Sequence, residues 1–391
     1  SNVVDKFLSI QSERFRKPVF RLFHTELEAV YEEKNRSLDN DQWKIQEAMH
    51  YLVFPTHNYG QQSTIGTIEH LNNPSLVAIR NYYFKNYVPN NMAAILAGDF
   101  NPDELIKKID KVFSYMQPRS VEAYNGPIEQ PIKGPFVKEI YGPSSETIRI
   151  VFRIGPAASA EAGLANITSL ILSNGKAGLL DLNLIKQQKL LSAGAGVRQY
   201  KDYGIFYLSG TPKQGQTLEQ IKDILLEQIN KLKKGEFDES LIQAIVYNLK
   251  LNEMQGRQDN ANRVDNITDE FIKHRGELWD KKVSFLYNAE KLSKKDIVDF
   301  ANRFFTDNNY AVIYKRKGED KSIVKVDKPS ITPVVTNADM QSDFVKMIMK
   351  DPVAPIKPIW VDYNKDIQKS TTGIADVLDV PNKNNSIFKL T

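Results

Sequence analysis

The sequence predicts an α+β protein of two to three domains, and its length, composition and apolar patterning each support this class. At about 150 residues per domain, 391 residues are too many for a single core. Apolar residues make up 41% and charged residues 26%, which is typical of folded globular chains rather than disordered or fibrous ones. Helical apolar spacing dominates before residue 116, whereas alternating, strand-like runs appear after residue 135.

Residues 1–115 have the pattern of a helical unit. Apolar residues at spacings of three and four predict helices at residues 3–17, 19–37, 42–54 and 76–88. The exception is the short apolar run at residues 92–98, which follows Pro89 and precedes Pro102. This run predicts one buried strand that leads into a helix ending near Phe113.

A linker and a second unit follow. Residues 116–135 have linker composition, with Pro118, Gly126, Pro127, Pro131, Gly134 and Pro135. Residues 136–317 mix strand and helix patterns. The expected strands cover residues 137–141, 147–154, 192–200, 205–209 and 310–314, with a hairpin between the third and the fourth. The expected helices cover residues 161–173, 179–189, 218–233, 238–255, 261–273 and 294–305.

The last segment, residues 318–391, has the composition of an extended connector. Scattered prolines and few periodic stretches leave only one short helix, expected at residues 343–349. Because a tail of this length usually leads to further structure, we expect it to point toward the second half of a longer protein. The next domain would open near residues 385–390.

Composition excludes several kinds of chemistry. Without cysteine, the chain has no disulfide framework, thiolate zinc site or cysteine nucleophile. Fifty-two basic against 48 acidic residues give a net charge of +4, too balanced to indicate a nucleic-acid partner. No apolar run approaches the ~18 residues of a membrane span. Neither H-E-x-x-H nor H-x-x-E-H is present, since no two of the histidines lie three or four residues apart: His24, His50, His57, His70 and His274.

Two motifs have competing interpretations. Glu26 and Glu33 lie seven residues apart on one predicted helix, so both carboxylates can face the same site. Glutamate is also a good helix former that needs no partner in water, so a solvated acidic face is the alternative. The motif Gly194-x-Gly196 matches no phosphate loop and lies in a predicted strand, which favours close backbone packing over phosphate binding.

The two units have similar ends. Residues 84–95 parallel residues 304–313, and matching Asn91 to Asn309 gives an offset in numbering of 309 − 91 = 218. The second unit extends from Phe136 to Asn309 before it reaches this point, whereas only positions 1–90 precede Asn91 in the first. The missing portion corresponds to the strand-rich part. We therefore predict that the chain begins inside a first domain whose sheet-forming part lies outside this sequence.

A series of motifs runs through both units. Glu26 and Glu33, with Val30 between them, are followed by F-P-x-H-x-Y-G at residues 54–60, then by Gly66 and F-x-x-Y-x-P-x-N-M at residues 84–92. In this order and spacing they resemble the pitrilysin/insulinase family of zinc metallopeptidases, the inverzincins. The resemblance extends over about residues 26–316. Members of that family carry H-x-x-E-H on one helix and a third zinc ligand, a glutamate, on a later helix.

The resemblance implies roles for the two glutamates and a fold. Glu33 would be the third zinc ligand, and Glu26 would orient or tune the ion from the outer shell. The fold would be that of LuxS/mitochondrial-processing-peptidase-like metallohydrolase domains, with a partial copy at residues 1–115 and a complete, non-catalytic copy at residues 136–317. The offset of 218 places Ala244 and Leu251 where Glu26 and Glu33 stand, so the second copy lacks both carboxylates.

The implied function is part of a zinc-dependent endopeptidase that cleaves peptides. H-x-x-E-H should precede Glu33 by several tens of residues, and only positions 1–32 do so. We therefore expect this chain alone to be inactive, because the two histidine ligands and the general-base glutamate are absent. One alternative is a non-catalytic scaffold or partner subunit of the same family. Another is an unrelated helical interaction protein, which would have no strand-rich unit at residues 136–316.

The same interpretation predicts partners and a compartment. The partners would be peptide substrates and either the remaining parts of the polypeptide or a partner subunit, with no nucleic acid and no membrane span. The compartment would be the bacterial periplasm or the cytoplasm, and the periplasm is favoured.

Overall fold

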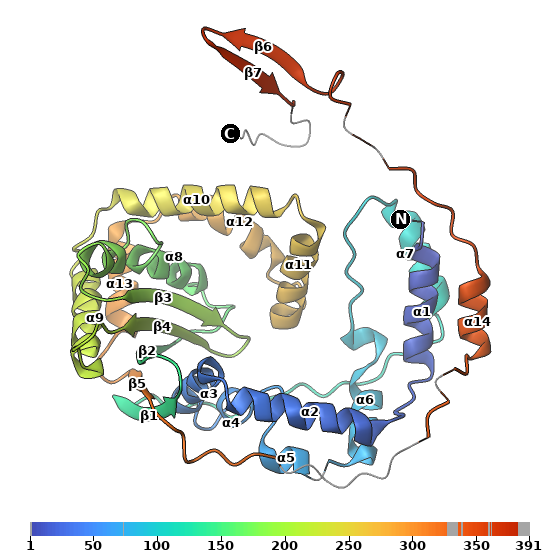
Figure 1. Ribbon diagram of the computed structural model, residues 1–391, viewed down its shortest axis with the longest axis horizontal. Helices are drawn as coiled ribbons and strands as arrows, with labels where there is room; N and C mark the ends of the chain where they lie inside the picture. The colour runs from blue at the N-terminus through green and yellow to red at the C-terminus, as the bar shows by residue number, and fades with distance from the viewer. Residues whose placement is uncertain are drawn as a thin grey trace.

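The computed structural model describes residues 2–72, 74–326, 335–337, 339–358, 360 and 362–381. Figure 1 shows a curved arrangement, with the helices before residue 116 on one side and the sheet domain after residue 135 on the other. The connector runs along the outer side of the N-terminal helices. Within the described ranges, no helix is long and apolar enough to span a bilayer. The expected domain start at residues 385–390 lies outside the described residues.

The helical pattern of the first unit is confirmed. Its longer helices are α1 (Val4–Arg16), α2 (Phe23–Leu38), α3 (Asp41–Val53), α6 (Leu76–Asn86) and α7 (Pro102–Phe113). The short helices α4 (Asn58–Gln61) and α5 (Ile68–Asn72) and the 3-10 turn η1 (Pro89–Asn91) lie between them. Helix α2 begins later than residue 19 because Leu22 adopts a left-handed conformation with φ 55° at its N-cap.

The strand expected at residues 92–98 is wrong. Met92 has extended backbone angles, φ −125° and ψ 156°, but residues 92–97 belong to no strand and their side chains are exposed or half-exposed. A strand needs a neighbouring strand to accept and donate its backbone hydrogen bonds. Among the described residues, no strand pairs with this segment.

The second unit contains a five-stranded mixed sheet. The strands are β1 (Phe136–Gly142), β2 (Thr147–Ile154), β3 (Ser192–Gln199), β4 (Gly204–Thr211) and β5 (Tyr310–Lys317). Their order is β1-β5-β2-β4-β3, in which β1 and β5 are parallel and the other neighbours antiparallel. The strand-rich unit contradicts the hypothesis of an unrelated helical protein. The domain division into residues 1–115, 116–135, 136–317 and 318–391 stays a prediction.

Apolar side chains cover both faces of the sheet. On one face, Ile148, Ile150 and Phe152 of β2 join a core with the helices that follow. On the other face, Val151 of β2 and Ile313 of β5 pack against α3. The period of two along each strand therefore sorts side chains between two cores. The helices of the unit are α8 (Ala162–Leu172), α9 (Leu218–Lys233), α10 (Ser240–Gly256), α11 (Asn260–His274), α12 (Trp279–Ala289) and α13 (Lys294–Phe304).

Three local expectations need correction. The helix expected at residues 179–189 is shorter, with α-helical residues 179–180 followed by the π-helix η2 (Asp181–Ile185), and Gln188 takes a left-handed conformation with φ 53° beyond its end. Helix α12 was not expected from the sequence. The connector forms the expected helix α14 (Asp343–Lys350), and beyond it an unexpected hairpin of β6 (Gln368–Thr372) and β7 (Ala375–Asp379).

The offset of 218 relates helices of the two units. Adding 218 to the bounds of α2 gives 241–256, against Ser240–Gly256 for α10. The same addition takes α6 to 294–304, which are the bounds of α13. It takes α3 to 259–271, against Asn260–His274 for α11. Helices of the first unit thus correspond in order and length to helices of the second.

One side-chain hydrogen bond also recurs at this offset. The Asn91 amide Nδ2 donates to the carbonyl oxygen of Asn86 over 3.0 Å, and that of Asn309 donates to the carbonyl of Phe304 over 2.7 Å. Both bonds close the end of a helix, α6 or α13, immediately before an extended segment. In the second unit that segment is β5, whereas in the first it is the unpaired stretch 92–97.

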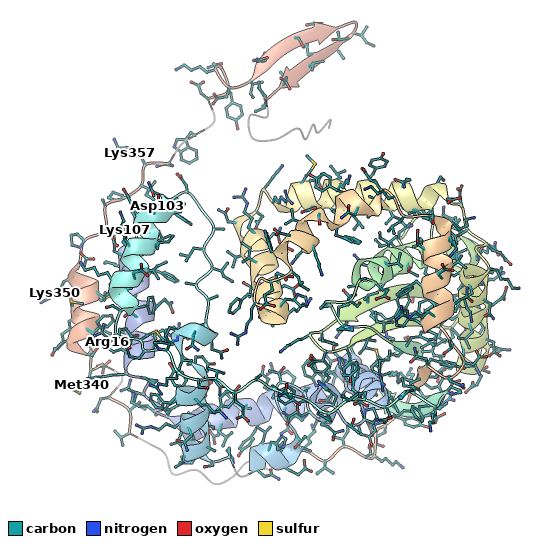
Figure 2. All side chains as sticks on the ribbon, turned by 180° about the vertical axis from the view of Figure 1, so that it is seen from behind. Arg16, Asp103, Lys107, Met340, Lys350 and Lys357 are labelled. Atoms are coloured by element: carbon teal, nitrogen blue, oxygen red, sulfur yellow. The ribbon has the colours of Figure 1, made fainter. Side chains whose placement is uncertain are left out.

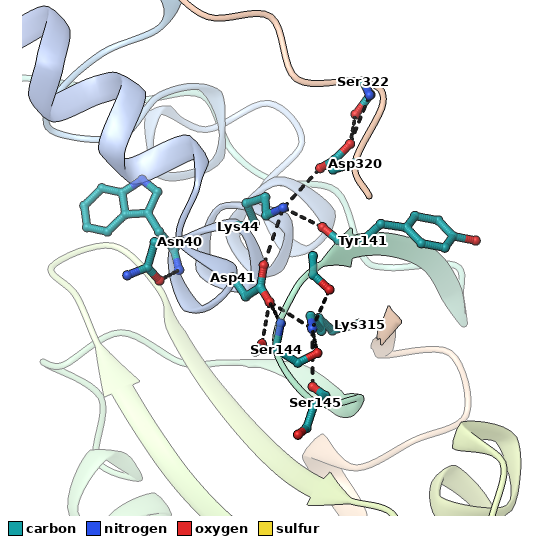
Figure 3. A network of polar contacts seen from close by, with 11 residues as sticks. Asn40, Asp41, Lys44, Tyr141, Ser144, Ser145, Lys315, Asp320 and Ser322 are labelled. Atoms are coloured by element: carbon teal, nitrogen blue, oxygen red, sulfur yellow. Dashed lines mark hydrogen bonds and ion pairs between the residues drawn. The ribbon is translucent and has the colours of Figure 1, made fainter. Parts of the chain in front are cut away.

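A buried ion pair joins the first unit to the sheet (Figure 3). Asp41, at the start of α3, lies 2.8 Å through its Oδ2 from Nζ of Lys315 on β5, and the Ser144 backbone N–H donates to the same oxygen over 2.9 Å. Lys315 is fully buried. Gly142 leaves room for this approach, since a Cβ there would lie 1.7 Å from Asp41 Oδ1.

Replacing Asp41 by Asn should destabilise the fold strongly. The change leaves the Lys315 ammonium buried without its counter-charge, and breaking such a pair costs about 3–5 kcal/mol. Urea unfolding at neutral pH measures this loss. Asp39→Asn is the matched control, because the Asp39–Lys325 pair is exposed and should contribute under about 1 kcal/mol. Equal effects of the two substitutions would contradict the role of the buried pair.

The Asp41–Lys315 pair also predicts that the stability of the fold depends on pH. Burial alone would raise the pKa of Asp41, but hydrogen bonds from Lys315 and Ser144 lower it from 3.8 to about 2. A carboxyl whose pKa is lowered on folding stabilises the fold above pH 3.8 and loses this contribution as the pH falls toward 2. The contribution is about 2 kcal/mol. The stability difference between wild type and Asp41→Asn should therefore narrow between pH 4 and pH 2.

Candidate functional site

Helix α2 carries both candidate glutamates and is anchored along one side. Leu27 and Tyr31 are buried in a small cluster with Leu71 and Val326, and the Tyr31 hydroxyl donates to the Leu71 carbonyl over 2.9 Å. Lys34, also buried, pairs with Glu47 of α3 at 3.3 Å. These contacts fix the helix while leaving its remaining surface free.

Glu26 and Glu33 lie on that remaining surface, where both are exposed. The structure places them on one helix, as expected, two turns apart. A catalytic zinc requires three protein ligands, usually with histidine among them. In the described part of the chain, no group of three or more His, Asp, Glu or Cys side chains could hold a metal ion. These residues alone therefore do not form a zinc site.

Four of the five histidines have other partners. His50 Nε2 lies 2.7 Å from the Tyr200 hydroxyl, and His274 Nδ1 lies 3.0 Å from a Glu270 carboxylate oxygen. The His70 ring accepts a bond from the Thr67 backbone, and His57 is almost fully buried. His24 is exposed at the start of α2. The histidines are thus separate structural elements rather than a metal-binding set.

Two motifs that lie far apart in the sequence meet at one junction in the structure. His57 belongs to the motif at residues 54–60 and Asp202 to the β3–β4 hairpin, yet His57 Nε2 lies 3.5 Å from Asp202 Oδ2. The Tyr59 hydroxyl donates to the same carboxylate over 3.2 Å. Burial, more than the nearby Asp202 charge, raises the pKa of Tyr59 to about 12, so this hydroxyl keeps its proton at neutral pH.

The linker adds a buried carboxylate to this junction. Glu129 accepts from the backbone N–H of Thr56 over 2.8 Å and lies 3.5 Å from the Arg153 guanidinium of β2. Arg153 also donates to the Val53 carbonyl over 2.7 Å. Neither residue was singled out from the sequence, because a lone glutamate between prolines and a lone arginine in a strand carry no motif. The junction therefore joins the first unit, the linker and the sheet.

The connector is clamped to the helix that carries the glutamates. The Val326 backbone N–H donates to Asn35 Oδ1 over 2.8 Å, and Asn35 Nδ2 donates back to the Val326 carbonyl over 3.2 Å. Val326 is buried against Leu27 and Tyr31. The segment that leaves the last strand of the sheet is thereby fixed to α2.

Further along, the connector follows the outer side of the first unit. Figure 2 shows Met340, Lys350 and Lys357 along the side of the helices that carry Arg16, Asp103 and Lys107. Asn2 donates to the Ala354 carbonyl, and Lys6 of α1 donates to that of Asp351. The connector thus contacts the N-terminal unit at two separate places.

The second unit is an α+β domain, and comparison with known proteins shows which proteins the chain resembles. The model of the peptidase M16 inactive domain matches residues 75–249. A curated Helicobacter pylori protein named zinc protease PqqE is 21% identical over 278 residues, which are 68% of this chain and 59% of that protein. Residues 75–249 of this chain therefore resemble the inactive domain of the peptidase M16 family. The chain spans less than two thirds of the length of the Helicobacter pylori relative.

Solved structures agree with the assignment at the level of the fold. The crystal structure of a protease from Helicobacter pylori matches with a TM-score of 0.72 at 18% identity, over 80% of this chain and 76% of that one. The periplasmic protease PqqL from Escherichia coli matches with a TM-score of 0.65 at 13% identity. That match covers 98% of this chain and 45% of PqqL. The family resemblance drawn from the motifs is confirmed.

Replacing Asn35 by Ala should release the connector from α2. The change removes both hydrogen bonds to Val326, and we expect amide exchange at residues 318–326 to accelerate about tenfold. Hydrogen–deuterium exchange read by mass spectrometry measures this. Arg36→Ala is the matched control, since Arg36 lies next to Asn35 on the same helix and makes no contact with Val326 among the described residues. Unchanged exchange at residues 318–326 in Asn35→Ala would show that packing of Val326 alone holds the segment.

Proposed function

We propose that this chain is part of a zinc-dependent endopeptidase of the pitrilysin/insulinase type that cleaves peptides, and that it is not catalytic by itself. The observation that carries the proposal is the placement of Glu26 and Glu33 on a helix anchored only along its other side. Glu33 would be the third zinc ligand, and Glu26 would stabilise the site from beside it. The two histidines and the general-base glutamate would come from outside this chain.

The exposed apolar surface and the unpaired segment of the first unit support this proposal. Helix α13, the counterpart of α6, contacts β2 of the sheet, whereas the unpaired stretch 92–97 follows α6 at the positions that correspond to β5. Large apolar side chains of the first unit remain exposed: Leu76, Val77, Ile79, Tyr82, Phe84 and Tyr87. Contiguous exposed apolar surface of this kind marks an interaction site. A strand-rich partner segment, carrying H-x-x-E-H, would pair with residues 92–97 and cover these side chains.

A non-catalytic scaffold or partner subunit is the second candidate. The match to the inactive-domain model favours it, as does the second unit, where Ala244 and Leu251 of α10 stand at the positions of Glu26 and Glu33. In such a protein the partner segment would cover the same surface without supplying H-x-x-E-H. The presence or absence of H-x-x-E-H in the complete protein distinguishes the two candidates.

Partners and compartment follow from the same proposal. Peptides would be the substrates, and the remaining parts of the same polypeptide, or a partner subunit, would complete the site. A bacterial periplasmic location is favoured over a cytoplasmic one, and the description of the structurally similar PqqL as a periplasmic protease supports this. The connector would lead to the second half of the protein.

Zinc titration tests whether this chain by itself has too few ligands to hold the ion. Because the described residues contain no group of three or more possible metal ligands, the chain should take up zinc no more tightly than a generic acidic surface. Isothermal titration calorimetry at neutral pH measures the uptake, and the Glu26→Gln, Glu33→Gln double variant is the control. Tight one-to-one binding that the double variant loses would overturn the proposal that the site is incomplete.

Glu33→Gln tests the role of the ligand in a protein extended to include H-x-x-E-H. The change replaces a charged ligand by a neutral amide and should abolish peptide cleavage and lower zinc content. Peptide hydrolysis and metal content are both measured. Glu32→Gln, which changes the adjacent exposed carboxylate, is the control. Retained cleavage with full zinc content in Glu33→Gln would show that Glu33 is not a ligand.

A further inference from the structure

One part of the sheet face that α3 covers stays accessible. Helix α3 packs over β1, β5 and β2, whereas β3, the outermost strand, presents half-exposed residues along its length. On β3 the apolar Ala193, Ala195 and Val197 face the opposite core. Gly194, Gly196 and Arg198 therefore face the α3 side. Two of these three positions have no side chain, so side chains of the neighbouring strand β4 can lie over this floor.

A tyrosine and an arginine lie across this floor. Tyr207 of β4 pairs with Gly196, and a Cβ on Gly196 would come within 2.6 Å of the Tyr207 hydroxyl. Glycine at this position thus lets the ring lie over β3, which explains the motif Gly194-x-Gly196. The Arg149 guanidinium of β2 lies 5.3 Å from the Tyr207 ring centroid. Ser209, paired with Arg149, places a half-exposed hydroxyl on the same face.

The register sets a second arginine on the other side of the tyrosine. Arg149 pairs with Ser209 and Arg198 with Ile205, so Tyr207 lies between these two positions on β4. The two arginines come from strands on either side of β4, and both are half-buried. Burial, with a smaller contribution from the nearby Arg198 cation, lowers the pKa of Arg149.

Neither arginine has a counter-charge. Arg153, further along β2, pairs with Glu129 at 3.5 Å, whereas Arg149 and Arg198 form no ion pair with any carboxylate of the described residues. Among the described residues, the partner of the Arg198 side chain is the neutral Tyr200 hydroxyl. Desolvating a guanidinium without an anion is unfavourable, and a carboxylate relieves this cost through two parallel hydrogen bonds. A flat tyrosine between two guanidiniums that lack a counter-charge is therefore suited to an anionic ligand.

We propose that Arg149, Arg198, Tyr207 and Ser209 form a binding site for peptide carboxylates, and that the ligand is an acidic peptide lying on the face of β4 and β3. The peptide nature of the ligand rests on the proposed function. The two arginines bind carboxylates, the tyrosine and serine hydroxyls donate to the same groups, and the glycines let Tyr207 and Ser209 lie over β3. The site would give the second unit a preference for acidic peptides independently of the zinc site.

Fluorescence anisotropy with labelled peptides tests the site on the full 391-residue chain. The first peptide carries glutamates and an amidated C-terminus, the second carries glutamines and a free C-terminal carboxylate, and the third carries glutamines and an amidated C-terminus. We expect the first to bind, Arg149→Gln and Arg198→Gln each to weaken it about tenfold, and the third to bind weakly. Stronger binding of the second peptide would assign the same carboxylate chemistry to the C-terminus.

Control variants make the outcome decisive. Arg303→Gln removes an exposed arginine that already pairs with Glu161, and its binding should match wild type. Arg198→Lys keeps the charge and should retain most of the affinity for the first peptide. If Arg149→Gln does not fold, the affinity of Arg198→Gln alone tests the site. Equal affinity of wild type and Arg198→Gln, or equal binding of all three peptides, would overturn the inference. Because the assay needs no zinc, its failure is distinct from a failure of the peptidase proposal.

Discussion

The buried pair of Asp41 and Lys315 is the constraint on which the arrangement of the two units depends. Lys315 lies on an inner strand, where an ammonium without a counter-charge would be strongly unfavourable. Asp41 is the first residue of α3, so the pair fixes the point where that helix begins to cross the sheet. Helix α2 ends just before it, at Leu38. A contact with the second unit therefore determines where the first unit holds Glu26 and Glu33.

Much of the fold could be predicted because its signals are local. The strand Thr147–Ile154 was predicted with the bounds that the structure has, since its apolar residues fill two cores and its ends are marked by turns. Residues 92–98 have similar local composition, yet strand formation depends on a partner strand, which local sequence does not encode. The buried ion pair of Lys315 could not be predicted either, because its partner Asp41 lies near the other end of the chain. Pairing across such distances leaves no periodic trace in a sequence.

In the candidate site, too, some features could be predicted from the local sequence and others could not. The spacing of Glu26 and Glu33 and their exposure follow from helix geometry and could be predicted from residues 23–38 alone. The connector clamp, which is the pair of hydrogen bonds between Asn35 and Val326, could not be predicted. Asn35 has no neighbour in its helix that marks it out, and Val326 is one apolar residue among many. The clamp links the helix of the glutamates to the segment that leaves the sheet. Movement of the connector would therefore be transmitted to that helix through two hydrogen bonds and one buried side chain.

In the described part of the chain, charge without a partner of opposite sign has a different meaning at α2 and on the sheet face. Glu26 and Glu33 are exposed, so water solvates their carboxylates at little cost, and their presence alone does not require a ligand. Arg149 and Arg198 are half-buried on a sheet, where Arg153 on the same strand as Arg149 has a glutamate beside it. Keeping two guanidiniums there without a carboxylate lowers the stability of the free chain and is offset only when an anion binds. By this energetic criterion the sheet face indicates a ligand more strongly than the acidic helix does.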